Sequence, residues 1–94
     1  MRPFRFLELK IWITKNSDVP VRAQIVSQVR VGIASGDLRP GDRLPSTREI
    51  ARRFGVHANT VSAAYRELAA AGVVDLRKGS GIYVCENGRD ALDV

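Results

Sequence analysis

The sequence predicts a small α+β domain that is mainly helical, with three helices followed by a two-stranded hairpin. Three observations predict it. A helix-capping motif formed by Ser46 and Glu49 opens a short helical segment. Apolar residues recur at helical spacing on both sides of that segment, and two β-prone runs near the C-terminus flank a glycine-rich turn. The 94 residues suffice for one domain of ordinary size.

Composition and charge narrow the class of protein. The chain is 45% hydrophobic and 27% charged, as globular proteins are. Its formal net charge of +5 and its pI of about 10.1 are typical of nucleic-acid-binding modules. Cys85 is the single cysteine, which excludes an internal disulfide and favours a reducing, cytoplasmic setting. No run approaches the ~20 apolar residues of a membrane helix, so no membrane partner is expected.

The first segment, residues 1–18, is expected to form a strand and a turn. Apolar residues at every second position over 7–13 predict a half-buried strand. Trp12 lies on its other face, where it covers either a packing surface or a partner. A turn-rich break follows at 15–18. Asp18 is the expected N-cap of the next helix, with Pro20 in its first turn.

The next helix is amphipathic and ends at Ser35-Gly36. Pro40-Gly41 then predicts a tight turn with positive φ at the glycine. The apolar stripe of the helix consists of Val21, Ile25, Val26, Val29 and Ile33.

Two further helices are joined by a tight turn. The capping motif starts a helix at about Thr47, and Gly55 stops it after barely two turns. A longer helix follows and ends at Gly72. This pattern predicts a helix-turn-helix, although a plain helical hairpin with solvated polar residues has the same spacing. The apolar residues of the longer helix are Val61, Ala64, Tyr65 and Leu68, so Tyr65 is expected in the core rather than at a contact surface.

The polar first turn of the longer helix suits the major groove of DNA. In a helix-turn-helix the N-terminal residues of the second helix contact base edges. Here those residues are small or polar: His57, Ala58, Asn59, Thr60 and Ser62.

A β-hairpin completes the predicted domain. Val73 to Leu76 and Ile82 to Val84 form its strands around a turn at 78–81, with Lys78 and Gly79 at its tip. Three helices followed by such a hairpin describe a winged helix-turn-helix domain over 19–84. Residues 85–94 have no clear pattern and are expected to be a tail or the start of a linker.

These motifs resemble the DNA-binding domain of the GntR family of bacterial transcription regulators, with most similarity to the YtrA-like and MocR-like subgroups. The similarity covers about Val19 to Val84, and its most diagnostic part runs from LPSTRE to NTV. It implies a repressor that binds a two-fold, inverted-repeat operator as a homodimer. The larger dimerisation or effector parts of those subgroups do not fit this length, so a small-molecule effector would act only through a missing or separate domain.

The resemblance also implies roles for particular residues. Arg48 occupies the position aimed at the operator; its alternative is an ion pair with Glu49 or Asp42. Asn59 pairs with adenine or caps its helix, and His57 contacts a phosphate or base or is only a capping or exposed histidine. Many members carry Arg where this chain has Ala58, so its preferred operator should differ. The implied DNA-binding residues are Ser46, Thr47, Arg48, His57, Asn59, Thr60, Ser62, Arg66, Lys78 and Gly79.

Other arginines are expected to supply sequence-independent attraction to phosphates, and not all of them can face DNA. These are Arg43, Arg52, Arg53, Arg66 and Arg77.

No catalytic residues, metal ligands or cofactor-binding motif are expected, because no nucleophile is paired with a base and no glycine loop cradles phosphate. An enzyme is therefore not expected. The alternative function is a winged-helix module for protein–protein interaction, which would more often expose apolar residues at the polar turn.

Overall fold

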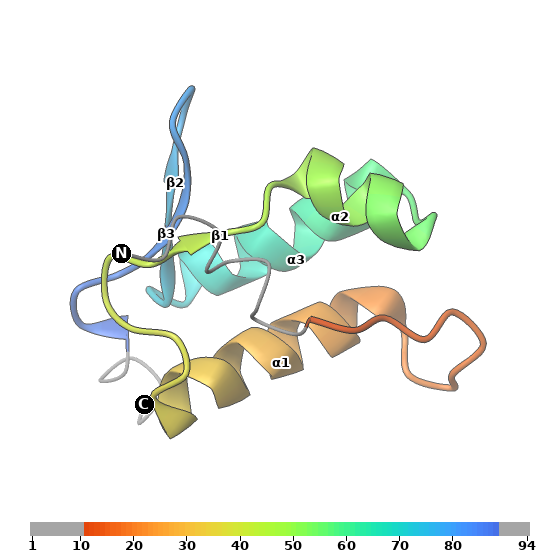
Figure 1. Ribbon diagram of the computed structural model, residues 1–94, viewed down its shortest axis with the longest axis horizontal. Coiled ribbons are helices and arrows are strands. Elements are labelled where there is room, and N and C mark those ends of the chain that lie inside the picture. Colours follow the sequence, from red (N-terminus) through yellow and green to blue (C-terminus); the bar gives the residue numbers. More distant parts are fainter. Residues whose placement is uncertain (1–10, 89–94) are drawn as a thin grey trace.

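A computed structural model describes residues 11–88 of the chain. It confirms the predicted class: helices dominate, and a small antiparallel sheet stands at one end of them (Figure 1). The elements follow the order α1 (Val21–Ser35), β1 (Arg43–Leu44), α2 (Thr47–Phe54), α3 (Ala58–Ala70), β2 (Val74–Arg77) and β3 (Gly81–Val84).

Helix α1 buries the predicted stripe except for Val21, which is half-buried. Gly36 ends the helix with a φ of 89°, the left-handed conformation expected there. The expected cap is wrong, however. The helix begins one residue after Pro20, which occupies the N-cap position, so Asp18 lies too far upstream to cap it. The Pro20 carbonyl accepts the first helical hydrogen bond, from the Gln24 N–H.

Helices α2 and α3 form the predicted helix-turn-helix. The Ser46 hydroxyl accepts from the Glu49 N–H over 3.0 Å, and a Glu49 carboxylate oxygen accepts from the Ser46 N–H over 2.9 Å. This reciprocal pair is the capping box that the sequence predicted. Gly55 ends α2 with a φ of 66°. Both boundaries of α2 were therefore encoded locally.

The sheet has a third strand that the sequence analysis did not predict. The strand order is β1-β3-β2, and all pairs are antiparallel. Arg43 lies opposite Tyr83 and Leu44 opposite Ile82, while the predicted hairpin of β2 and β3 is confirmed. Strand β1 spans two residues, too few to show an alternating pattern. It forms because the turn before α2 brings it alongside β3.

The expected strand over 7–13 is not found in the part that the structure describes, and residues 7–10 lie outside it. Residues 11–14 have no strand partner. Instead, two side chains of α1 form the backbone hydrogen bonds that a neighbouring strand would form. Gln28 accepts from the Trp12 N–H over 2.8 Å and donates to its carbonyl, and Gln24 pairs with both backbone groups of Thr14. The alternating pattern remains meaningful, because Ile13 is buried and Trp12 is 65% exposed.

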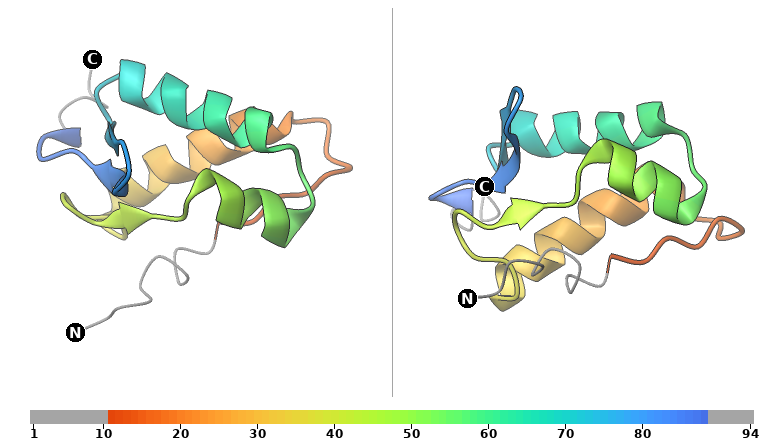
Figure 2. Two further views of the ribbon diagram at one scale, coloured as in Figure 1. Left: turned by 90° about the horizontal axis from the view of Figure 1, so that it is seen from above. Right: turned by 45° about the horizontal axis from the view of Figure 1, so that its top comes forward.

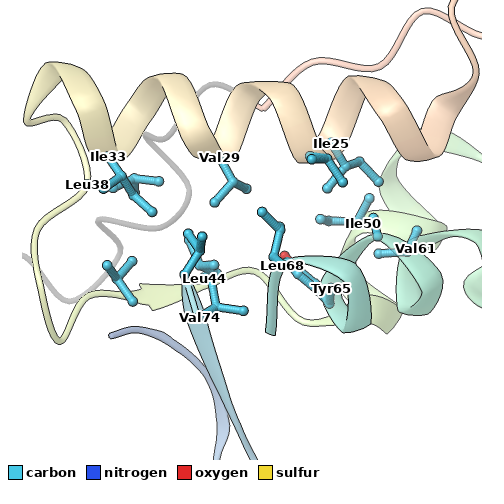
Figure 3. Close-up of a cluster of buried hydrophobic side chains, with 14 of the residues drawn as sticks. Ile25, Val29, Ile33, Leu38, Leu44, Ile50, Val61, Tyr65, Leu68 and Val74 are labelled. Atoms are coloured by element: carbon cyan, nitrogen blue, oxygen red, sulfur yellow. The ribbon is translucent and has the colours of Figure 1, made fainter. Parts of the chain in front are cut away.

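The core lies between α1 on one side and α2, α3 and the base of the sheet on the other (Figure 3). Ile25 and Val29 of α1 face Leu68 and Tyr65 of α3, and these four side chains are almost completely buried. Tyr65 is thus in the core, as expected. Its hydroxyl donates to the Pro45 carbonyl over 2.5 Å, which ties α3 to the residue that precedes the capping box. The core therefore fixes the start of α2 relative to α3.

Candidate nucleic-acid interface

An open groove runs between the start of α2, one face of α3 and the wing formed by β2 and β3. Seen from above, α2 and α3 lie side by side and the wing stands at the C-terminal end of α3, with α1 beneath (Figure 2). Among residues 11–88, five basic side chains and no carboxylate line the groove. They are Arg43, Arg48, Arg66, Arg77 and Lys78.

The start of α2 contributes Ser46, Thr47 and Arg48 to the groove. Because the Ser46 oxygen already accepts from a backbone N–H, its hydroxyl proton is the part left for an anionic ligand. Arg48 is exposed, and within residues 11–88 it forms no ion pair with Glu49 or Asp42. Its guanidinium can therefore reach a phosphate or a base edge without first breaking such a pair.

Helix α3 brings Ser62 and Arg66 into the groove with Ala58, because residues four apart share a helix face. Ala58 thus lies at the groove, where many family members carry an arginine. The smaller side chain leaves that position without a charged group.

The remaining predicted residues of α3 lie outside the groove. His57 is the N-cap, without a side-chain hydrogen bond to the helix, and its carbonyl accepts from the Thr60 N–H. Asn59 lies inside the first turn rather than at the cap, so the capping alternative for Asn59 is wrong. His57 and Asn59 are exposed at the helix start and Thr60 is half-buried. These three residues surround the tip of α3, whereas the groove follows its side.

The wing supplies Lys78 and Gly79, which the sequence placed at its tip. It also supplies groove residues absent from the predicted DNA-binding set: Leu76, Arg77, Ser80, Gly81 and Ile82. Arg43 joins them from β1. Arg43 and Arg77 were expected only as general attraction to phosphate. Arg77 lies in the hairpin that the sequence predicted, whereas the place of Arg43 follows from the pairing of β1 with β3, which no local sequence signal reveals.

The groove also has apolar lining residues. Leu76 and Ile82 of the wing are among them, and so is Tyr65, although only 1% of its surface is exposed. Burial raises the pKa of the Tyr65 phenol well above its usual value, and the nearby Glu49 carboxylate raises it further. Tyr65 is therefore a neutral donor to Pro45 rather than a ligand-binding group.

Arg52 and Arg53 lie outside the groove, at the C-terminal end of α2. The Arg53 guanidinium lies 5.8 Å from the centroid of the Phe54 ring, and Trp12 contacts the same ring edge-on at 5.7 Å.

Among residues 11–88, no group of three or more His, Cys, Asp or Glu side chains could hold a metal ion. No helix in this part of the chain is long and apolar enough to cross a membrane.

Comparisons with known proteins agree on one family. The model of the gntR family of bacterial regulatory proteins matches residues 21–84. The HTH-type transcriptional repressor YtrA of Bacillus subtilis is 39% identical over 82 residues, which cover 87% of this chain and 63% of YtrA. The chain thus spans less than two thirds of the length of that relative.

Solved structures show the same architecture. YtrA from Sulfolobus acidocaldarius, a GntR-family transcription factor, superposes with a TM-score of 0.70 at 40% identity, covering 80% of this chain and 79% of that one. The DNA-binding domain of AraR, solved in complex with its operator ORX1, gives a TM-score of 0.66 at 25% identity over 78% of this chain and 87% of that one. The chain belongs to the GntR family of bacterial regulatory proteins and carries the winged helix-turn-helix domain of that family.

Proposed function

We propose that this chain binds double-stranded operator DNA in a sequence-specific way and represses transcription. Residues 19–84 form the DNA-binding domain, with 1–18 as an N-terminal extension and 85–94 as a tail or linker. The protein acts in the cytoplasm and has no enzymatic activity of its own.

The observation that carries this proposal is the groove, to which residues 11–88 contribute five cations and no carboxylate. DNA binding depends largely on neutralising phosphates, and a groove of one sign concentrates that attraction. The groove also joins the start of α2, α3 and the wing, which are the parts that contact DNA in helix-turn-helix proteins. The relatives support it, since YtrA of Bacillus subtilis is named a repressor and AraR was solved on its operator.

Two kinds of contact contribute to recognition: contacts with base edges and contacts with phosphates. The exposed tip of α3, with His57 and Asn59, reads base edges in the major groove, where an asparagine can pair with adenine. Thr60, Ser62 and the hydroxyls at the start of α2 contact phosphates and fix the register. Arg48 follows Ser46 and Thr47 at the start of α2 and is suited to a bidentate contact with guanine.

The operator is an inverted repeat bound by a homodimer. One domain presents one α3 tip and one wing, and reads one half-site. Two copies would place their recognition helices in successive major grooves about 34–36 Å apart. A small-molecule effector would act through a separate domain.

Selection of bound sequences from random duplex DNA tests this function, followed by affinity measurements against salt. An enriched inverted repeat is expected. If each of the five groove cations neutralises one phosphate, log K should fall against log salt with a slope of about −4 to −5 per domain. Enrichment of a single asymmetric half-site would refute binding as a homodimer. Absence of binding at low salt would favour the protein–protein interaction module.

Charge reversal at Arg48 tests the assigned contact. Arg48→Glu should weaken binding to the selected operator at least about tenfold, because it removes a base contact and adds repulsion. Arg39→Glu is the matched control, since Arg39 is exposed but lies outside the groove. Equal losses in the two variants would show that only net charge matters and that Arg48 reads nothing.

A further inference from the structure

The wing carries one basic side chain that is held from two sides. The Arg77 Nε donates to a carboxylate oxygen of Asp75 over 3.0 Å, and the guanidinium carbon lies 4.5 Å from the centroid of the Tyr83 ring. Tyr83 is itself fixed, because its hydroxyl lies 3.1 Å from the Ser80 hydroxyl and donates to the Ser80 carbonyl. The Arg77 side chain is therefore ordered by the wing itself.

The sheet register brings these groups together. Asp75 lies directly opposite Tyr83 in the β2–β3 pair, and Arg77 lies opposite Gly81. Residues two apart on a strand share a face, so Asp75, Arg77 and Tyr83 are neighbours on one face of the wing. Arg77 is also one of the residues that line the basic groove.

Stability gives a poor explanation for this arrangement. The side chains of Asp75 and Arg77 are 50% and 55% exposed, and ion pairs so exposed contribute little to the free energy of unfolding. Order in the arginine matters more for binding. A long side chain loses rotamer freedom when it contacts a ligand, and a side chain that is already ordered loses less. Since the contact with Asp75 uses only Nε, the terminal nitrogens keep four N–H donors for a ligand.

We propose that Asp75 and Tyr83 are positioning residues that hold the Arg77 guanidinium in place for a DNA phosphate. This inference rests on the DNA-binding function proposed above and adds two residues to it, neither of which touches the DNA. One of them carries a negative charge.

Because Asp75 is negatively charged, the direction in which its substitution changes DNA affinity tests the proposal. Simple electrostatics predicts that removing a carboxylate beside the groove strengthens DNA binding, because the phosphates are negative. Positioning predicts the opposite, because the amide oxygen of an asparagine holds the Arg77 guanidinium more weakly than a carboxylate does. Asp37→Asn removes the same charge from an exposed site outside the groove and serves as the matched control.

The experiment measures binding of the full chain to a fluorescently labelled duplex of about three helical turns by anisotropy, with the selected operator and with random sequence. Asp75→Asn should weaken binding about threefold to tenfold, the range expected for losing the order of one long side chain. Asp37→Asn should leave affinity unchanged or slightly raised. Thermal unfolding of both variants confirms that they are folded.

A double-mutant cycle shows whether Asp75 acts through Arg77. In the Arg77→Ala background, Asp75→Asn should no longer weaken binding. Tyr83→Leu, which removes the ring, should weaken binding in the wild-type background only. An Asp75→Asn variant that binds as well as the wild type or better would overturn the positioning role, as would an equal loss in both backgrounds. If the wild type itself binds no duplex at low salt, the proposed DNA-binding function is wrong, a result distinct from these two.

Discussion

The hydroxyl of Tyr65 offers the sharpest test of how the domain holds its helix-turn-helix together. Tyr65→Phe keeps the aromatic ring in the core but removes the donor of the 2.5 Å hydrogen bond to Pro45. Both residues are buried, so water cannot replace the lost donor. The bond also joins residues 20 positions apart, so its loss affects tertiary structure rather than a local turn.

The expected cost follows from that burial. A buried carbonyl left without its donor costs about 1–3 kcal/mol. Taking about 2 kcal/mol, and about 4–8 °C per kcal/mol for a domain of this size, the midpoint of thermal unfolding should fall by about 8–16 °C. Urea denaturation gives the free energy of unfolding directly, and the slope of that transition should not change.

Tyr83→Phe is the matched control for stability. It removes the same phenolic oxygen, but from a tyrosine whose hydroxyl bonds to the exposed Ser80. Its free energy of unfolding should change by less than about 0.5 kcal/mol. If Tyr65→Phe costs no more than Tyr83→Phe, the assignment of the Tyr65 hydroxyl as a structural tether is wrong.

Tyr65→Phe should also change how the free energy of unfolding depends on alkaline pH. The pKa of Tyr65 is raised in the folded state, by burial first and by Glu49 second, whereas in the unfolded chain it is about 10. The unfolded chain therefore binds fewer protons above about pH 10, and stability is full below that pH and falls above it. Tyr65→Phe lacks this loss, so the stability gap between wild type and variant should narrow from pH 9 to pH 11. A constant gap would contradict a raised pKa.

Three other variants each test one feature of the fold. Ser46→Ala removes the capping hydroxyl and should lower the free energy of unfolding by about 1 kcal/mol in urea titration; no loss would contradict the capping box. Gly55→Ala forces a side chain into a φ of 66° and should cost about 1–2 kcal/mol in the same assay, whereas a neutral result would mean that the turn relaxes. Replacing Gln24 and Gln28 by Ala together should accelerate hydrogen exchange at the Trp12 and Thr14 amides. Unchanged exchange would show that these two side chains do not protect the amides.

Local sequence determined the elements whose signals lie within a few residues. The capping box and Gly55 set both ends of α2, because each depends on atoms at most a turn away. The apolar stripe set the buried face of α1, and the turn between two β-prone runs set the wing. Family resemblance added the position of Arg48 at the groove.

Tertiary structure decided the features that depend on distant partners. Residues 11–14 show the alternation of a strand, yet their backbone groups pair with Gln24 and Gln28, because an amide side chain presents the same donor and acceptor as a neighbouring strand. Strand β1 exists only because β3 lies beside it.

The groove shows the same division between what is local and what is not. The sequence by itself determined that the chain is basic, that its α3 tip is polar and that a wing follows. It did not determine which cations converge. Arg43 joins Arg77 in one groove because β1 pairs with β3 in a particular register, and that register joins residues far apart in the chain.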